Sequence, residues 1–237
     1  MIFMKIKEIH TFDVEPARAI QIQETLRGHL ILSGDPGEVS LVAGADASCA
    51  KGSNEIHAAV VVLGYPDFGI VERVSVSVVT GYPYIPGLLA FREGPALIEA
   101  FRRLRSEPDV IFFDGHGIAH PRGIGIASHM GLLLDRPSIG VAKSLLTGSA
   151  AKPGFMRGSM TPILRDGETI GMAVRTKEGT KPVYVSVGHR ISLEAAVDLV
   201  LATARGYRLP EPTRQAHLLS NAVRKESRGA SRSPSLG

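Results

Sequence analysis

The segment 109–125, with the sequence DVIFFDGHGIAHPRGIG, constrains the fold more than any other part of the chain. Its first residues, Val110 to Phe113, form an unbroken apolar run, which is typical of a short strand buried on both faces of a parallel sheet. The run ends at Asp114, and a turn rich in glycine and histidine follows. Because open α/β sheets bind their ligands at the carboxyl ends of the strands, we predict that Asp114 lies at a functional site.

The composition is that of a globular protein from a reducing compartment. The chain has 237 residues, of which 44% are apolar, and its single cysteine is Cys49. One cysteine excludes an internal disulfide framework and a cysteine zinc cluster. Charges interrupt the first residues where a signal peptide would be apolar, and no apolar run approaches the ~20 residues of a membrane span. We therefore expect a cytoplasmic protein that does not contact a membrane.

The charge balance gives a weak indication of a polyanionic partner. The formal net charge is +4, with a pI near 9.3, and clustered basic residues bind phosphate backbones by releasing counterions. Part of the excess lies near the carboxyl end. We expect one domain over residues 1–226, followed by a basic, Ser/Gly-rich tail without fixed structure over residues 227–237. We also expect a monomer.

Hydrophobic periodicity and turn signals divide the chain into alternating strands and helices. Strands are predicted over residues 38–47, 56–63, 70–79, 109–114, 137–142, 161–164, 169–174 and 183–187. Helices are predicted over residues 16–32, 88–93, 95–105, 124–134, 193–204 and 213–225. The order indicates an α/β fold with a mixed sheet, in which an antiparallel three-strand meander is followed by parallel strands, with helices on both faces. The first strand and the strand at 109–114 are expected to lie side by side.

Two carboxylates would then end neighbouring strands. Asp46 ends the first strand and Asp114 ends the strand that we place beside it. Such a pair repels unless a cation lies between the two groups, and oxygen ligands favour Mg²⁺ or Mn²⁺ over zinc. Glu93 is either a third ligand or a solvated helix residue, and the Gly-Pro that follows it favours the ligand. A site of this kind can hydrolyse phosphodiesters by activating a bound water.

Other polar residues cluster around the motif strand. His116 and His120 have the spacing of a helical zinc site, but the glycines and the proline around them argue against a helix there. His120 is then expected to support the metal centre or to contact phosphate. Arg122 either binds phosphate or faces solvent. Lys143 follows a predicted buried strand, where it could offset the charge of a reacting phosphate.

The loop Pro83-Tyr84-Ile85-Pro86 holds an aromatic and an aliphatic side chain between two prolines. One interpretation is a turn that tucks Tyr84 into the core. The other is a stiff wedge that inserts between bases, because unstacking a duplex requires an apolar group that does not retreat.

Four motifs together resemble the endonuclease V family, the deoxyinosine-specific DNA repair nucleases. They are Pro83-Tyr-Ile-Pro-Gly87, Phe91-Arg-Glu93, Asp114-Gly-His-Gly-x-x-His120-Pro-Arg and Gly140-Val-Ala-Lys143-Ser. The resemblance covers nearly the whole chain and implies a ribonuclease H-like fold. It also implies that Asp46 and Asp114 hold Mg²⁺, that Glu93 completes the acidic site, and that His217 matches a family histidine near the metal.

The resemblance extends to the substrate. It implies that Tyr84 leads a wedge formed with Pro83, Ile85 and Pro86, and that a backbone-lined pocket receives the flipped base. The residues with the bare surface that such a pocket needs are Gly87, Gly115 and Gly117. Lys143 and His120 would contact phosphate near the cut, which lies at the second phosphodiester 3′ to the lesion and leaves 3′-hydroxyl and 5′-phosphate ends. Two alternatives stay open: cleavage of inosine-containing RNA, and a non-catalytic nucleic-acid-binding module.

Overall fold

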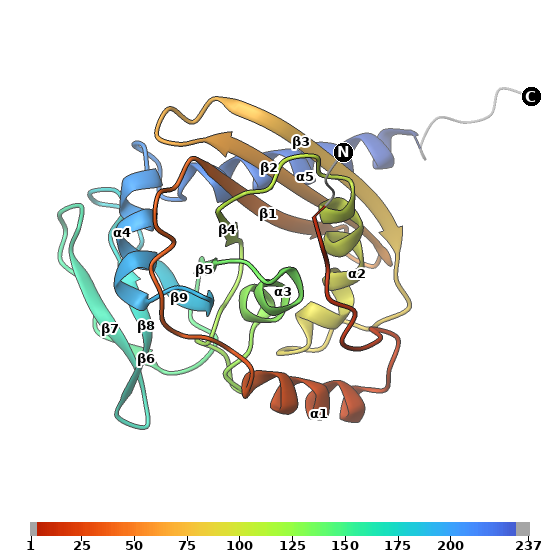
Figure 1. Cartoon of the computed structure of the whole chain (residues 1–237), viewed down its shortest axis with the longest axis horizontal. Coiled ribbons are helices and arrows are strands. Elements are labelled where there is room, and N and C mark those ends of the chain that lie inside the picture. The colour runs from red at the N-terminus through yellow and green to blue at the C-terminus, as the bar shows by residue number, and fades with distance from the viewer. Residues whose placement is uncertain (1–3, 231–237) are drawn as a thin grey trace, which may run out of the picture.

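A single mixed sheet runs through the centre of the protein (Figure 1). The structure is a computed structural model, and it describes residues 4–230. The sheet has nine strands in the order β3-β2-β1-β4-β5-β9-β8-β7-β6. Within residues 4–230, no helix combines the length and the apolar character that crossing a membrane requires.

The first five strands form the part of the sheet that carries the aspartates. β1 (Leu41–Cys49), β2 (Glu55–Gly64) and β3 (Ile70–Val79) are an antiparallel meander. β4 (Val110–Phe113) pairs parallel with β1, and β5 (Ser138–Ala142) pairs parallel with β4. The predicted mixed sheet is therefore confirmed, and so is the pairing of the first strand with the motif strand.

The last third of the chain extends the same sheet. β9 (Val183–His189) pairs antiparallel with β5, and β8 (Glu168–Val174), β7 (Met160–Arg165) and β6 (Ser149–Ala150) follow in antiparallel order. The two-residue strand β6 was not predicted. A segment this short carries no periodicity that a sequence pattern could reveal.

Helices cover both faces of the sheet, so the protein has a core on each side (Figure 1). α2 (Leu89–Arg102) and α3 (Ile126–Leu134) lie on one face, while α4 (Leu193–Thr203) and α5 (Glu211–Ala230) lie on the other. Ile111 and Phe113 of β4 pack into the first core, and Val110 and Phe112 pack into the second. This two-sided burial explains the unbroken apolar run of β4.

α1 (Pro16–Arg27) does not pack on the sheet; its residues Ala19, Ile22 and Leu26 join a buried cluster with residues that include Phe91 of α2 and Leu132 of α3. The helix was predicted to reach residue 32, but it ends where Gly28 follows. Glycine is common directly after a helix because it loses the most backbone freedom inside one.

The predicted break at Gly94-Pro95 is wrong. α2 is one continuous helix from Leu89 to Arg102, with Pro95 inside it. An interior proline costs about 3 kcal/mol, whereas full burial of a large apolar side chain contributes roughly 1.5–3 kcal/mol. Phe91, Leu97 and Phe101 are all fully buried on this helix, so tertiary packing outweighs the local penalty.

Two other boundaries differ from the prediction. β1 continues past Asp46 to Cys49, because its pairing with β2 extends beyond the point where its pairing with β4 stops. Asp46 therefore lies inside its strand instead of at the end. α5 continues through residues 227–230, which the sequence analysis assigns to the tail. Residues 231–237 of that tail lie outside the described residues.

Candidate functional site

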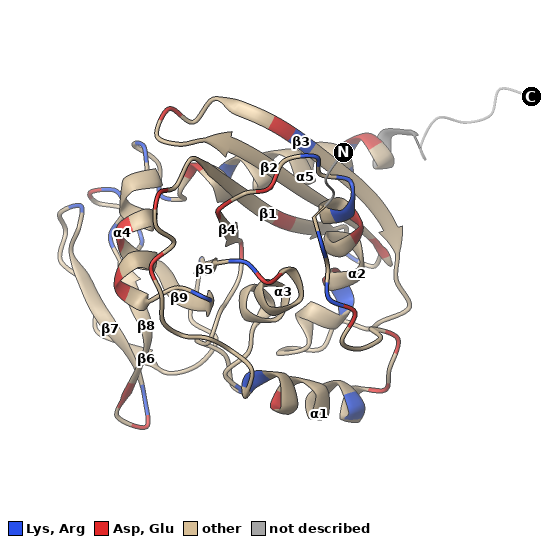
Figure 2. Ribbon diagram, viewed as in Figure 1, with Lys and Arg blue, Asp and Glu red and all other residues tan. Residues whose placement is uncertain are grey.

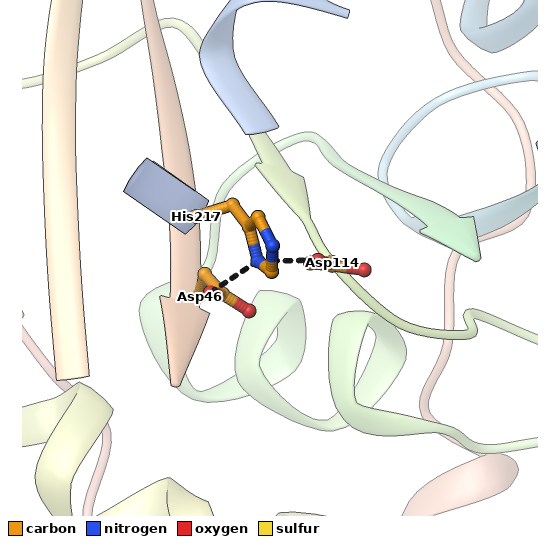
Figure 3. Close-up of side chains that lie close together, drawn as sticks. All are labelled: Asp46, Asp114 and His217. Carbon is orange, nitrogen blue, oxygen red and sulfur yellow. Dashed lines mark hydrogen bonds and ion pairs between the residues drawn. The ribbon is translucent and has the colours of Figure 1, made fainter. Parts of the chain in front are cut away.

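Three side chains from distant parts of the chain meet at one edge of the sheet (Figure 3). Asp46 comes from β1, Asp114 follows β4, and His217 comes from α5. One ligand atom from each of them lies within 4.8 Å of the others. His217 Nδ1 lies 3.1 Å from Asp46 Oδ2 and 3.5 Å from Asp114 Oδ2. The two aspartates thus face each other, as the pairing of their strands predicted.

Strand pairing positions the aspartates, and a close approach of α5 adds the histidine. Ala45 lies opposite Phe113 in the parallel pair, and the Asp114 N–H donates to the Ala45 carbonyl at 3.0 Å. Gly44 precedes this pair on β1. A Cβ atom at that position would lie 1.9 Å from the Pro212 carbonyl oxygen. Only glycine lets the start of α5 approach the strand so closely.

Ser220 is a functional candidate that the sequence analysis missed. Its hydroxyl donates to Asp46 Oδ2 at 2.6 Å, and its carbonyl accepts from the Ser48 hydroxyl at 2.9 Å. Ser220 is fully buried. The one available signal was its position three residues after His217, which places both side chains on the same face of a helix.

Positive charge stands beside the acidic pair. Lys143 Nζ forms an ion pair with Asp114 Oδ2 and lies 3.4 Å from His217 Nδ1. Burial and the charge of Asp46 raise the pKa of Asp114 above its usual value, although Lys143 and His217 oppose this effect. Lys143 therefore lies at the acidic centre, and its expected role in offsetting charge on a phosphate stays a prediction.

Glu93 lies near the centre without joining the group of three. It sits on α2 and is partly buried, so the solvated-helix interpretation is wrong. Burial, with the charges of Asp46 and Asp114, raises the pKa of Glu93 to about 8. Among the described residues, the group whose ligand atoms converge contains Asp46, Asp114 and His217 only.

The donor set fits a divalent cation. Two carboxylates supply hard oxygen ligands and negative charge, and His217 supplies a ring nitrogen. Burial is the main cause of the raised pKa of Glu93 and of Asp114, and the negative charge of a neighbouring carboxylate raises both pKa values further. A bound cation would relieve this repulsion.

A pocket of about 210 Å³ lies next to the acidic centre. His116, two residues after Asp114, lines it together with the loop that contains Tyr84. Tyr84 is 71% exposed, whereas Tyr82 is buried. The interpretation that tucks Tyr84 into the core is therefore wrong, and the loop presents its aromatic ring to solvent beside the pocket. The loop residues that line the pocket are Tyr84, Ile85, Pro86 and Gly87.

His120 and Arg122 lie at the base of this loop. The His120 ring is buried, and its two nitrogens are hydrogen-bonded to the Gly87 carbonyl and to the Arg122 backbone N–H. Burial and the charge of Arg122 lower the pKa of His120 to about 4. The half-buried Arg122 guanidinium donates from Nε to Gln23 and from Nη2 to the Gly87 carbonyl, so it does not simply face solvent. Gln23 had not been singled out.

Two of the three glycines assigned to the pocket have a packing role. A Cβ atom on Gly117 would lie 2.0 Å from the Val187 carbonyl oxygen, and one on Gly115 would lie 2.6 Å from the Ile126 side chain. Neither residue lines the pocket, whereas Gly87 and Gly125 do. Gly115 and Gly117 therefore let the segment after β4 pack tightly against its neighbours.

The distribution of charged residues along the fold does not identify a binding face. Figure 2 shows lysine and arginine spread over helices and loops throughout the fold, with acidic residues among them. The net charge of +4 is therefore not gathered on one element. The acidic centre and its pocket are more specific guides to function.

Comparison with known proteins gives one consistent family. The model of the family described as endonuclease V matches residues 24–218. An endonuclease V from Gloeobacter violaceus is 50% identical over 220 residues, which is 92% of this chain and 89% of that protein.

Solved structures agree. An endonuclease V structure from Streptomyces avermitilis superposes with a TM-score of 0.86 at 39% identity, covering 96% of this chain and all of that one. Endonuclease V from Ciona intestinalis, in complex with DNA containing an inosine followed by a ribo-adenosine, matches with a TM-score of 0.78 at 29% identity, covering 89% of this chain and 98% of that one.

Proposed function

The chain belongs to the endonuclease V family and is thus an endonuclease, and on that premise we propose that it is a Mg²⁺-dependent DNA repair enzyme that acts at deoxyinosine. It hydrolyses the second phosphodiester 3′ to the lesion and leaves 3′-hydroxyl and 5′-phosphate ends. Support for the substrate comes from the Ciona intestinalis relative, whose structure contains DNA with an inosine.

The acidic centre would carry the hydrolysis. Asp46, Asp114 and His217 would hold Mg²⁺, with Mn²⁺ as a substitute, and Glu93 would complete the acidic surroundings. When bound, such a cation lowers the pKa of a water ligand and neutralises charge on the phosphate. Lys143 Nζ, which already stands at Asp114, would offset charge on the scissile phosphate.

The exposed loop would recognise the lesion. Tyr84, supported by Pro83, Ile85 and Pro86, would occupy the space that the displaced base leaves in the stack. The pocket behind the loop would receive that base, with Gly87 among its backbone-lined walls. The pocket and the acidic centre are adjacent but separate, which suits a cut displaced along the strand from the lesion.

One observation carries the proposal. Asp46, Asp114 and His217 come from three segments far apart in the sequence, yet their ligand atoms converge within 4.8 Å. Two buried or half-buried carboxylates held together in this way favour a cation between them.

The test is Asp114→Asn on a duplex that contains one deoxyinosine. The amide keeps the shape but removes the charge, so we expect nicking to fall by more than about 100-fold, beyond the 10–100-fold typical of outer-shell losses around a metal. The matched control is Asp166→Asn, an exposed turn aspartate with a φ of 53° that asparagine tolerates. Unimpaired nicking by Asp114→Asn would reject the metal assignment.

Cleavage rates on matched DNA and RNA oligonucleotides test whether the substrate is DNA or RNA. We expect faster cleavage of the DNA, and preference for inosine-containing RNA would replace the substrate while leaving the acidic centre in place. Tight binding without any nick in Mg²⁺ would indicate a non-catalytic binding module. We further propose that the chain acts as one domain, which includes all of α5, in a monomer located in the cytoplasm.

A further inference from the structure

The carbonyl of Gly87, at the end of the exposed loop, accepts three hydrogen bonds. Gln23 Nε2 donates at 3.0 Å, His120 Nε2 lies at 3.0 Å, and Arg122 Nη2 donates at 2.6 Å. Within residues 4–230, the hydrogen bonds that tie the loop 83–87 to distant segments all end on this one oxygen. Its surroundings therefore determine where the loop stands.

The proton positions in this network are determined by its chemistry. Arginine offers only donors, so the Gln23 oxygen must face Arg122 Nε, at 2.6 Å. The Gln23 amide nitrogen is then directed to the Gly87 carbonyl, with a second contact to the Ile124 carbonyl at 3.3 Å. His120 Nδ1 accepts from the Arg122 N–H, which leaves the proton on Nε2 for Gly87.

Gly87 cannot be replaced without moving its partners. Its φ is +82°, which is strained for a residue with a side chain, and a Cβ atom there would lie 2.7 Å from Arg122 Nη2. Gly87, which follows the last proline of the loop, therefore has a backbone conformation that places its carbonyl among the three donors.

Gln23 brings a separate element into this arrangement. It lies on α1, it is 1% exposed, and it lines the pocket with the loop residues. Its neighbours on the helix, Ile22 and Leu26, share a buried cluster with Leu88, the residue that follows the loop. The side-chain amide that bonds to the Gly87 carbonyl is thus carried by α1, which is separate from the loop 83–87.

We propose that Gln23 is a positioning residue for the loop 83–87, and that through it α1 sets how strongly the enzyme separates deoxyinosine from normal nucleotides. The inference rests on the wedge role given to this loop under the proposed function. A wedge opens a base step only if it does not give way. Gln23 supplies this resistance because it is buried and uses both ends of its amide.

The test measures base opening without catalysis. A duplex carries deoxyinosine with 2-aminopurine as its neighbour, and fluorescence is recorded at saturating protein with Ca²⁺ in place of Mg²⁺. The wild type should raise the fluorescence by unstacking the probe. Gln23→Leu should lose most of that rise. Gln21→Leu is the matched control, because Gln21 lies on the same helix with an exposed side chain that bonds only to Arg18.

Steady-state cleavage gives the second readout. Gln23→Leu should raise KM for the lesion substrate about tenfold with little change in kcat, since a hydrogen bond of about 1.4 kcal/mol corresponds to that factor. Gln23→Glu keeps the volume and the contact to Arg122 but cannot donate to Gly87, so it should behave like Gln23→Leu. A merely structural role would lower thermal stability without this division between KM and kcat.

The outcomes separate the two proposals. A full fluorescence rise with both Gln23 variants would overturn the inference and leave the proposed function intact. No rise with the wild type would instead reject the wedge role itself. Failure of both variants to fold would also overturn the inference, because it would make Gln23 a structural residue of α1.

Discussion

At the scale of single residues, the carboxylate of Asp46 is held in place by two partners from α5. Its Oδ2 atom accepts from the Ser220 hydroxyl at 2.6 Å and lies 3.1 Å from His217 Nδ1. Ser220 thus restrains the orientation of the carboxylate that we propose as a metal ligand. Partners of this kind set the geometry and the basicity of a ligand.

Ser220→Ala should therefore weaken metal binding without removing it. The hydroxyl holds Asp46 in place, and losing such an outer partner costs about 10–100-fold in metal affinity. Titration with Mn²⁺ measures the change. Ser128→Ala is the control, since Ser128 lies on α3, is equally buried, and donates to the carbonyl of Val187 in β9 instead of to Asp46. Equal affinity in the two variants would contradict the role of Ser220.

Glu93 predicts a pH dependence of stability in the metal-free protein. The pKa of Glu93 is raised from 4.5 to about 8 in the folded protein. Between those values the folded protein keeps a proton that the unfolded chain has released, so this contribution to stability is greatest below about pH 4.5 and is lost as the pH rises to about 8.

Glu93→Gln should remove this component, because glutamine does not titrate. The gain of the variant over the wild type should grow with pH up to about 8, at about 1.4 kcal/mol for each unit of pKa difference. Chemical denaturation across this range, in EDTA, measures it. A constant difference between the two proteins at every pH would show that Glu93 ionises normally.

Some site residues were predictable because the residues next to them in the sequence form a recognisable pattern. Asp114 stood at the end of an apolar run and Tyr84 between two prolines. Ser220 and Gln23 had no such mark, since each acts through one contact across the fold, with Asp46 and Gly87. The bonding of His120 was not predictable either, because both of its ring nitrogens are bonded to backbone groups, the Gly87 carbonyl and the Arg122 N–H, that no local pattern reveals.

At the scale of elements, the docking of α5 on β1 completes the centre. The helix begins at Glu211, and its Pro212 carbonyl lies where a side chain on Gly44 would have to stand. Farther along, Ser220 accepts from Ser48 through its carbonyl. The helix therefore follows the strand closely enough to place His217 beside Asp46.

Gly44→Ala should separate these two elements. The added methyl group would lie 1.9 Å from the Pro212 oxygen, and overpacking of this kind typically costs about 1–3 kcal/mol. We expect a lower melting temperature together with weaker Mn²⁺ binding, because His217 moves with the helix. Gly69→Ala is the control, since a Cβ atom there meets nothing within 4 Å. Unchanged metal binding by Gly44→Ala would show that α5 adjusts without moving His217.

The bounds of a helix or strand were predictable where the element has the same packing environment along its whole length. β4 was found from its apolar run because both of its faces are buried. α2 was divided in error at Pro95, since the local rule for proline did not include the burial of Phe91 and Phe101. The end of β1 depended on a longer antiparallel partner, which no pattern inside the strand reveals.

At the scale of the whole molecule, two functional regions meet at the segment that follows β4. The acidic centre combines β1, β4 and α5, whereas the pocket combines α1, the exposed loop and residues after Asp114. Asp114 belongs to the first region, and His116 and His120 belong to the second. The regions proposed for recognition and for hydrolysis are therefore built from different elements and joined by one short segment.

Tyr84→Ala should affect one region only. Lesion binding should weaken by roughly 1–3 kcal/mol, the usual value for an aromatic ring that stacks on a base, while Mn²⁺ affinity stays at the wild-type level. Tyr84→Phe should restore binding because the ring is kept. A comparison of binding to deoxyinosine and undamaged duplexes measures the effect, and equal losses on both would argue against lesion recognition by Tyr84.

The arrangement of the whole sheet was only partly predictable. The order of strands and helices was enough for the mixed sheet and for the neighbours β1 and β4. The antiparallel extension from β9 to β6 was not, because it depends on which free edge the last strands join. The basic excess likewise indicated nucleic acid without indicating a face.

The position of α5 at the end of the fold has a consequence for synthesis. Chains grow from the amino end and fold as segments emerge from the ribosome. A nascent chain that has not reached Glu211 already contains Asp46 and Asp114 but neither His217 nor Ser220. The group of three can form only when the last helix docks against Gly44. A nascent chain is thus kept from assembling the group of three until residues 211–220 have been synthesised.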